Sequence, residues 1–157
     1  MSVSFNQISK VFADGTVGLD HLSLEFEKGE FIVLLGPSGS GKTTACRILA
    51  GLEEATSGSV KVDELEVTSL PPRERNMGMV FQNYALYGHK TVYENIAYPL
   101  RIRKIDKGNI DNRVKEIAKV LQIENFLDRR PSQLSGGQAQ RVAVARAMVW
   151  SPDICLM

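Results

Sequence analysis

Residues 36–43 read Gly-Pro-Ser-Gly-Ser-Gly-Lys-Thr, and this stretch decides the fold. The apolar run Phe31–Leu35 precedes it, and apolar residues at helical spacing follow over Thr43–Leu52, so we expect a buried strand, a turn and a helix. Glycines let successive N–H groups face one anion, and a helix N-terminus adds its dipole. Lys42 supplies a positive charge and Thr43 a hydroxyl for Mg²⁺. The pattern predicts a nucleotide-phosphate site, and a generic glycine turn is the alternative.

Short strands are expected on both sides of this loop. Val3–Ile8 and Leu22–Phe26 alternate apolar with polar residues, as half-buried strands do. Ser59–Val62 and Glu64–Val67 suggest a small hairpin, and Met77–Phe81 is typical of another buried strand. These segments predict a sheet-rich first half.

The second half is predicted to be mainly helical. Lys115–Leu121 and Gln138–Trp150 carry apolar residues at helical spacing. The end, Ile154–Met157, is typical of the start of one more buried strand. Since no Gly/Ser-rich linker separates the halves, we expect one domain with an inserted helical lobe.

Composition narrows the function classes. The 157 residues carry a formal net charge of +1, with 43% hydrophobic and 24% charged residues, which is average for a globular protein and excludes a strongly basic nucleic-acid binder. The two cysteines, Cys46 and Cys155, form no metal or redox pair motif, so we expect buried thiols. An apolar run of five residues is too short to cross a bilayer.

A second helix start has phosphate-binding character. Residues 134–138 read Leu-Ser-Gly-Gly-Gln and precede the long helix expected over Gln138–Trp150. Two glycines expose N–H groups at the positive end of that helix, and Ser135 adds a hydroxyl. Taken alone, the same pattern also fits an ordinary helix start with a serine N-cap.

Together, the loop at 36–43 and the motif at 134–138 resemble the ATP-binding subunit of ATP-binding-cassette (ABC) transporters. The stretches 80–87 and 91–95 resemble the importer branch that energises sugar, polyol or glycerol-phosphate uptake. The resemblance implies an α/β fold: a P-loop NTPase (RecA-like) core with an antiparallel β subdomain and an inserted helical subdomain, C-terminally truncated. The expected parts are 1–82 for the core and β subdomain, 83–140 for the helical subdomain, and 141–157 for the signature helix and following strand.

The resemblance also implies roles for individual residues. Lys42 and Gln82 are the expected catalytic residues, and Thr43 and Gln82 the expected Mg²⁺ ligands. Phe12 matches an aromatic that stacks on adenine. The expected ATP-binding residues are Phe12, Gly36, Pro37, Ser38, Gly39, Ser40, Gly41, Lys42, Thr43, Thr44, Ser135, Gly136, Gly137 and Gln138.

The implied partners are transmembrane permease subunits and a second ATP-binding subunit, which would close head to tail around two ATP molecules. No nucleic-acid partner is expected. The implied location is cytoplasmic, peripheral on the inner face of the membrane through the permease. Tyr84, Leu86 and Tyr87 are candidates for the apolar docking patch, or equally for the core of the helical lobe.

The family's Mg²⁺-ordering Asp and water-activating Glu would follow Ile154–Met157, at positions 158 and 159. Asp153 precedes that strand and would lie at its opposite end. We therefore expect these 157 residues to hydrolyse ATP slowly or not at all, and the incomplete sheet to make them marginally stable.

Two alternatives remain open: a non-transport ABC ATPase, and a nucleotide-binding module without catalysis. Outside the motifs, Arg73 and Arg75 are expected on a solvated face, and His21 and His89 on the surface.

Overall fold

A computed structural model describes residues 2–157 and divides the chain into two compact units. The first unit ends at Met77, and the second spans Gly78–Met157. Each unit has its own buried residues and its own part of the predicted motifs.

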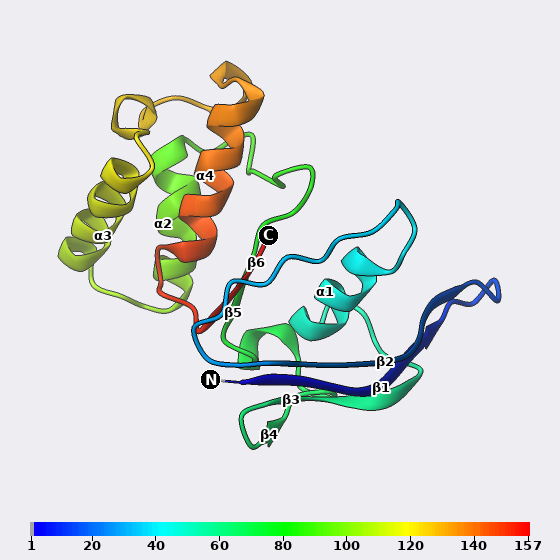
Figure 1. The fold of residues 1–157 in the computed structure, drawn as a ribbon. Helices are drawn as coiled ribbons and strands as arrows, with labels where there is room; N and C mark the ends of the chain where they lie inside the picture. Colours follow the sequence, from blue (N-terminus) through cyan, green and yellow to red (C-terminus); the bar gives the residue numbers. More distant parts are fainter. Residues whose placement is uncertain (1) are drawn as a thin grey trace. The chain divides into compact units, whose positions relative to one another are not determined.

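The first unit is built on an antiparallel sheet with the strand order β2-β1-β3-β4 (Figure 1). The strands are β1 (Val3–Val11), β2 (Val17–Phe26), β3 (Ser57–Val62) and β4 (Leu65–Glu66). Alternating side chains such as Val3, Phe5 and Val60 are buried on one face. The predicted strands in this region and the hairpin are therefore confirmed.

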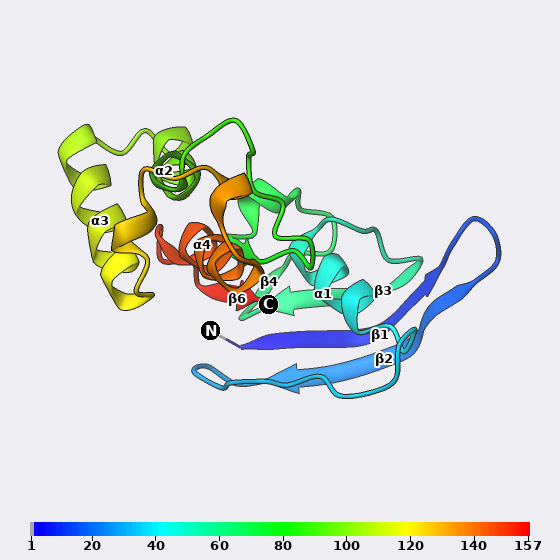
Figure 2. The same ribbon diagram turned by 90° about the horizontal axis from the view of Figure 1, so that it is seen from above.

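Helix α1 (Lys42–Ala50) follows the glycine-rich loop, as predicted. It buries Ala45, Ile48 and Leu49, and both views show it beside β1 and β2 of the sheet (Figures 1 and 2). The helix ends at Gly51, whose φ of +75° suits glycine. The antiparallel sheet therefore carries the loop and its helix as one unit.

The prediction of a buried strand at Phe31–Leu35 is wrong. No strand is present there, and the side chains of Phe31 and Leu35 are 90% and 88% exposed. A fully apolar strand is buried only where neighbouring strands pair with it and other elements cover both faces. Within residues 2–157 no strand pairs with this stretch, so it stays extended and open to solvent.

Arg75 also departs from the prediction, because only 6% of it is exposed. It follows a short 3₁₀ turn (Pro72–Glu74) and donates to the carbonyls of Ile48 and Leu49 at 2.6 and 2.9 Å. It also donates to the carbonyl oxygens of Leu70 and Thr68. This guanidinium therefore satisfies the last carbonyls of α1, which a helix cannot satisfy itself. Arg73 is exposed, as expected.

The second unit is a helical bundle made of α2 (Val92–Ile102), α3 (Lys107–Val120) and α4 (Gly136–Met148). The three helices lie side by side in both views (Figure 2). Their shared core includes Ile96, Leu100, Val114 and Val142, all fully buried. Two 3₁₀ turns (Glu124–Phe126 and Pro131–Gln133) lead from α3 into α4.

Helix α2 was not anticipated, although its start has a clear sequence signature. Thr91 accepts a hydrogen bond from the Glu94 N–H, and the Glu94 side chain accepts one from the Thr91 N–H, which is a capping box. Pro99 lies inside the helix, where proline is disfavoured. The helix persists because Ile96, Ala97 and Leu100 on its apolar face are fully buried in the helical core.

Two short strands, β5 (Met77–Met79) and β6 (Ile154–Leu156), form a separate two-stranded sheet. Next to it, the Val80 N–H donates to the Leu156 carbonyl at 2.9 Å. The strand expected over Met77–Phe81 is therefore shorter than predicted, and the strand after α4 is confirmed. Within residues 2–157, no helix is both long and apolar enough to cross a membrane.

Candidate functional site

The loop at 36–43 is shaped by glycines in the first unit. Gly39 and Gly41 have φ values of +82° and +85°, which side-chain-bearing residues rarely adopt. A Cβ atom on Gly41 would also lie 2.5 Å from the Gly18 carbonyl oxygen and 2.7 Å from a Leu19 methyl. Gly41 is therefore required both by its backbone conformation and by its close approach to β2.

Lys42 folds its side chain back into this loop. Its Nζ atom donates to the carbonyl oxygens of Gly36 and Pro37 at 2.8 and 2.7 Å, and to Ser40 Oγ at 3.0 Å. The loop is thus wrapped around one ammonium group. A positive charge held by a short, glycine-shaped loop is suited to an anionic ligand.

The first turn of α1 leaves its backbone donors available. Its N-cap is Gly41, no side chain caps it, and no acidic residue lies in the first turn. Thr43 is exposed there, and Thr44 is half-buried. Uncapped N–H groups, the helix dipole and the Lys42 charge fit the phosphates of ATP. The Thr43 hydroxyl fits a Mg²⁺ ion bound with them.

Phe12 lies beside the same helix start. It begins the turn between β1 and β2, closed by hydrogen bonds between Phe12 and Thr16 and between Gly15 and Phe12. A Cβ atom placed on Gly18 would lie 2.6 Å from the Phe12 ring and 3.4 Å from Thr44. The ring therefore covers Gly18 next to α1, where a flat base could stack on it.

Charged side chains support that ring. Lys10 Nζ lies 5.2 Å from the centroid of the Phe12 ring and 2.8 Å from Glu53 Oε1. The hydrogen bond from Lys10 lowers the pKa of the Glu53 carboxyl. The sequence analysis did not identify Lys10 or Gly18, because only the folded turn brings them to Phe12.

The remaining predicted residues belong to the second unit. Gln82 is exposed in the turn that follows β5. The motif at 135–138 forms the start of α4, where Ser135 is the N-cap. Ser135 Oγ accepts from the Gln138 N–H at 3.4 Å, and Gln138 Oε1 accepts from the Ser135 N–H at 3.0 Å. Gly136 and Gly137 are exposed. The motif is therefore an ordinary helix start with a serine N-cap, and its two glycines are also open to solvent.

Two residues that the sequence analysis missed hold the segment after Gln82. Arg146 on α4 donates to the carbonyl oxygens of Tyr84 and Ala85 at 2.9 and 2.7 Å. Asn95 on α2 is fully buried and exchanges hydrogen bonds with the Tyr87 N–H and C=O. Neither role has a sequence signature, because both side chains bind backbone atoms; those of Arg146 lie 61 and 62 positions away, and those of Asn95 only four to eight positions away.

Tyr84, Leu86 and Tyr87 are all half-buried. Leu86 packs on the helical core, and the Tyr87 ring lies 4.9 Å from the Tyr98 ring. Leu86 therefore packs at the edge of the helical core, and a docking role for the three residues stays a prediction. His21 and His89 are exposed, as expected.

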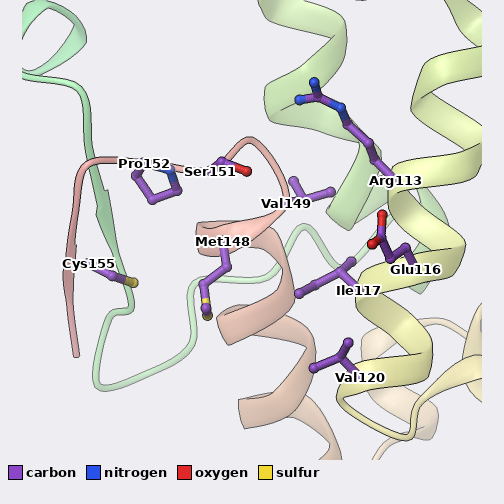
Figure 3. A pocket seen from close by; sticks show the side chains of 9 residues that line it. All are labelled: Arg113, Glu116, Ile117, Val120, Met148, Val149, Ser151, Pro152 and Cys155. Carbon is purple, nitrogen blue, oxygen red and sulfur yellow. The ribbon is translucent and has the colours of Figure 1, made fainter. Parts of the chain in front are cut away.

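The second unit also contains a cavity of about 540 Å³ between α3 and the C-terminal end of α4 (Figure 3). Apolar side chains from both helices face it, together with the Cys155 thiol of β6. Burial raises the pKa of that thiol above its ordinary value, which disfavours the nucleophilic thiolate. The residues that line the cavity are Arg113, Glu116, Ile117, Val120, Met148, Val149, Ser151, Pro152 and Cys155.

Comparisons with known proteins agree with this geometry. The family model described as "ABC transporter" matches residues 19–157. The sn-glycerol-3-phosphate import ATP-binding protein of Bordetella avium is 50% identical over 155 residues, which is 99% of this chain. The spermidine/putrescine import ATP-binding protein of Thermotoga maritima is 47% identical, again over 99% of this chain. The chain spans 43% and 42% of these two relatives, less than half of their length.

A solved structure is also similar. The dimeric ATP-binding cassette MJ0796, described in a post-hydrolysis state bound to ADP and phosphate, superposes with a TM-score of 0.89 at 34% identity. The match covers 98% of this chain and 72% of the other. The α/β fold with an antiparallel sheet and a helical part is therefore that of an ATP-binding cassette.

Proposed function

This chain belongs to the ABC transporter family, and from that premise we propose that it binds Mg²⁺-ATP as part of the ATP-binding subunit of a solute importer. The observation that carries the proposal is the loop wrapped around Lys42. Its ammonium makes three hydrogen bonds within the loop, directly before a helix start that no side chain caps.

The proposed division of labour follows from the chemistry of each group. The loop amides of 36–41 and Lys42 bind the phosphates. Thr43 and Gln82 bind Mg²⁺, and Thr44 lies beside the phosphates. Phe12 stacks on the base. When bound, Mg²⁺ neutralises part of the charge on the β- and γ-phosphates.

Ser135, Gly136, Gly137 and Gln138 are proposed to contact the ATP held by a second copy of the subunit. Support comes from the exposed glycines at the start of α4 and from the dimeric cassette that this chain resembles. Each half-site would be incomplete alone, so ATP would favour the closed pair. Permease subunits are the other proposed partners, and the inner face of the cell membrane the proposed location.

Hydrolysis itself is not proposed for residues 2–157 alone. Activating a water molecule beside the γ-phosphate requires a positioned group, most simply a carboxylate. Asp153 precedes β6 and does not follow it.

The transported solute is proposed to be a carbohydrate or a related compound such as a glycerol phosphate. The relative from Thermotoga maritima is named for spermidine/putrescine import, so not every similar protein is named for carbohydrate uptake.

The test is titration with a fluorescent ATP analogue in the presence of Mg²⁺. Lys42→Ala is expected to weaken binding about 10- to 100-fold, because hydrogen bonds to a charged donor contribute about 1.5–3 kcal/mol each. Lys61→Ala is the control, because Lys61 is exposed on β3. Equal losses in both variants would refute a specific phosphate role for Lys42. Tripolyphosphate competition separates phosphate binding from base binding.

Phe12→Ala provides the second arm of this test. It is expected to weaken ATP binding while leaving tripolyphosphate binding unchanged, because only the base would stack on the ring. An equal loss of affinity for ATP and for tripolyphosphate would show that Phe12 stabilises the loop and does not stack on the base.

A further inference from the structure

The segment that follows Gln82 adopts an unfavourable backbone conformation. Tyr84 and Ala85 have φ values of +60° and +45°, so two consecutive residues with side chains are left-handed. Each such residue is disfavoured by about 1 kcal/mol or more. The Tyr84 N–H donates to the Phe81 carbonyl at 2.8 Å, and the Ala85 N–H to the Asn83 carbonyl at 2.7 Å. This tight turn persists only if other contacts hold it.

Arg146 supplies two of those contacts. Its two terminal nitrogens reach the carbonyl oxygens of Ala85 and Tyr84, one each, at 2.7 and 2.9 Å. The guanidinium also lies 5.4 Å from the centroid of the Tyr87 ring. A planar fork that donates to two successive carbonyls fixes their direction, which a single ammonium group cannot do.

The far side of the same segment is held by α2. Asn95 Oδ1 accepts from the Tyr87 N–H at 2.8 Å, and Asn95 Nδ2 donates to the carbonyls of Tyr87, Lys90 and Thr91. Asn95 has no exposed surface. The segment is therefore fixed at its end by α2 and at its turn by α4.

The turn also reaches the start of α4. A Cβ atom placed on Gly136 would lie 4.0 Å from the Tyr84 hydroxyl. Arg146 lies ten residues further along α4, about 15 Å along the helix axis. Tyr84 is thus held at its carbonyl by one end of α4 and lies with its hydroxyl near the other end.

We propose that Arg146 is a positioning residue that locks the turn at Tyr84–Ala85 to α4, so that Gln82 and the helix start at 135–137 move as one body. The lock itself does not depend on the proposed function. Its effect does, because a displacement at Gln82 would be transmitted to the glycines proposed to contact the second ATP. A rigid helix and its hydrogen bonds to a neighbouring segment can carry such coupling.

Hydrogen exchange on Arg146→Gln tests the lock directly. The amides of Ala85 and Tyr87 are expected to exchange at least about 10-fold faster, because the left-handed turn loses its two donors. Arg141→Gln is the matched control, since Arg141 is exposed on the same helix. Arg146→Lys keeps the charge without the fork and should give an intermediate rate. Unchanged exchange at 84–87 in Arg146→Gln overturns the proposal.

A second substitution separates the lock from general loosening. Glycine adopts positive φ freely, so Ala85→Gly should restore slow exchange to the Arg146→Gln variant. If exchange stays equally fast in the double variant, the conformation of the turn is not what Arg146 holds. This arm also remains informative if Arg146→Gln alone folds poorly.

ATP-dependent self-association, followed by analytical ultracentrifugation, tests the coupling. In Arg146→Gln, ATP affinity should stay within about twofold, while self-association weakens about tenfold. Faster exchange with unaltered self-association would overturn the coupling. If the unsubstituted protein binds no ATP, the proposed function fails, and the exchange experiments still decide whether Arg146 locks the turn.

Discussion

Helices α1 and α4 both begin with glycines and hydroxyl side chains, but side chains cap the first turn only in α4. At α1 the N-cap is Gly41 and no side chain caps the first turn. At α4 the Ser135 and Gln138 side chains and N–H groups satisfy each other in a capping box. The two motifs look equivalent as sequences, and their hydrogen bonding differs.

This difference bears on the proposal that each of the two motifs binds phosphate. The start of α1 is suited to an anion, since its N–H groups have no side-chain competitor and the Lys42 ammonium folds back into the adjoining loop. The start of α4 already uses its serine hydroxyl, although the bond to the Gln138 N–H is long at 3.4 Å. A phosphate there would have to share or replace this cap. We therefore expect α1 to bind first and strongly, and α4 second and weakly.

The C-terminal ends of the helices differ too, and this gives the largest expected effect on stability. Arg75 satisfies the Ile48 and Leu49 carbonyls at the end of α1, whereas Arg146, in the last turn of α4, donates to a different segment. Arg75→Met should lower the free energy of unfolding by about 3 kcal/mol, because several carbonyls lose their donor. Urea denaturation measures it.

Arg73→Met is the control for that experiment. The Arg73 side chain is 84% exposed and forms an ion pair with Glu74, so the loss should stay below about 0.5 kcal/mol. A similar effect for both arginines would mean that the end of α1 does not depend on a cation.

The next effect concerns the glycines before α1. Gly41→Ala should destabilise by about 2 kcal/mol or more, because it combines a left-handed φ with a Cβ atom 2.5 Å from the Gly18 carbonyl. Gly39→Ala has the same φ problem but open space around it, so about 1 kcal/mol is expected. Thermal denaturation of the pair measures the difference, and equal losses would exclude the close approach as the cause.

The smallest effect is expected at the start of α4. Ser135→Ala should cost about 0.5–1 kcal/mol, the usual range for a lost N-cap in an exposed helix. It should not change ATP affinity at the loop around Lys42. Ser132→Ala, in the exposed turn before α4, is the control. A loss of loop affinity in Ser135→Ala would contradict the separation of the two helix starts.

The sequence predicted those parts of the fold that are encoded locally. The loop at 36–43, the start of α4 and the alternating strands are specified by glycine, serine and side-chain periodicity over a few residues. Residue roles at these positions remain predictions, whereas helix α1, the start of α4 and the alternating strands β1 and β2 agree with the prediction.

The features that the sequence analysis missed or misjudged depend on tertiary contacts with backbone atoms or with neighbouring strands. Arg75 is charged and sits near Arg73, so it resembled a surface residue, yet its carbonyl partners lie 26 and 27 positions earlier. Phe31–Leu35 is apolar enough for a central strand, but burial requires neighbours that a local pattern cannot supply. Arg146 and Asn95 were missed because they bind backbone atoms, which every residue has.

The exposed stretch Phe31–Leu35 has a consequence for how the chain is made. Ribosomes add roughly 5–20 residues per second, and the N-terminal side begins to fold first, so this apolar stretch meets water early. Chaperones bind exposed hydrophobic segments of this kind. Since Gly36 follows Leu35 directly, a chaperone holding the stretch would also cover the loop around Lys42.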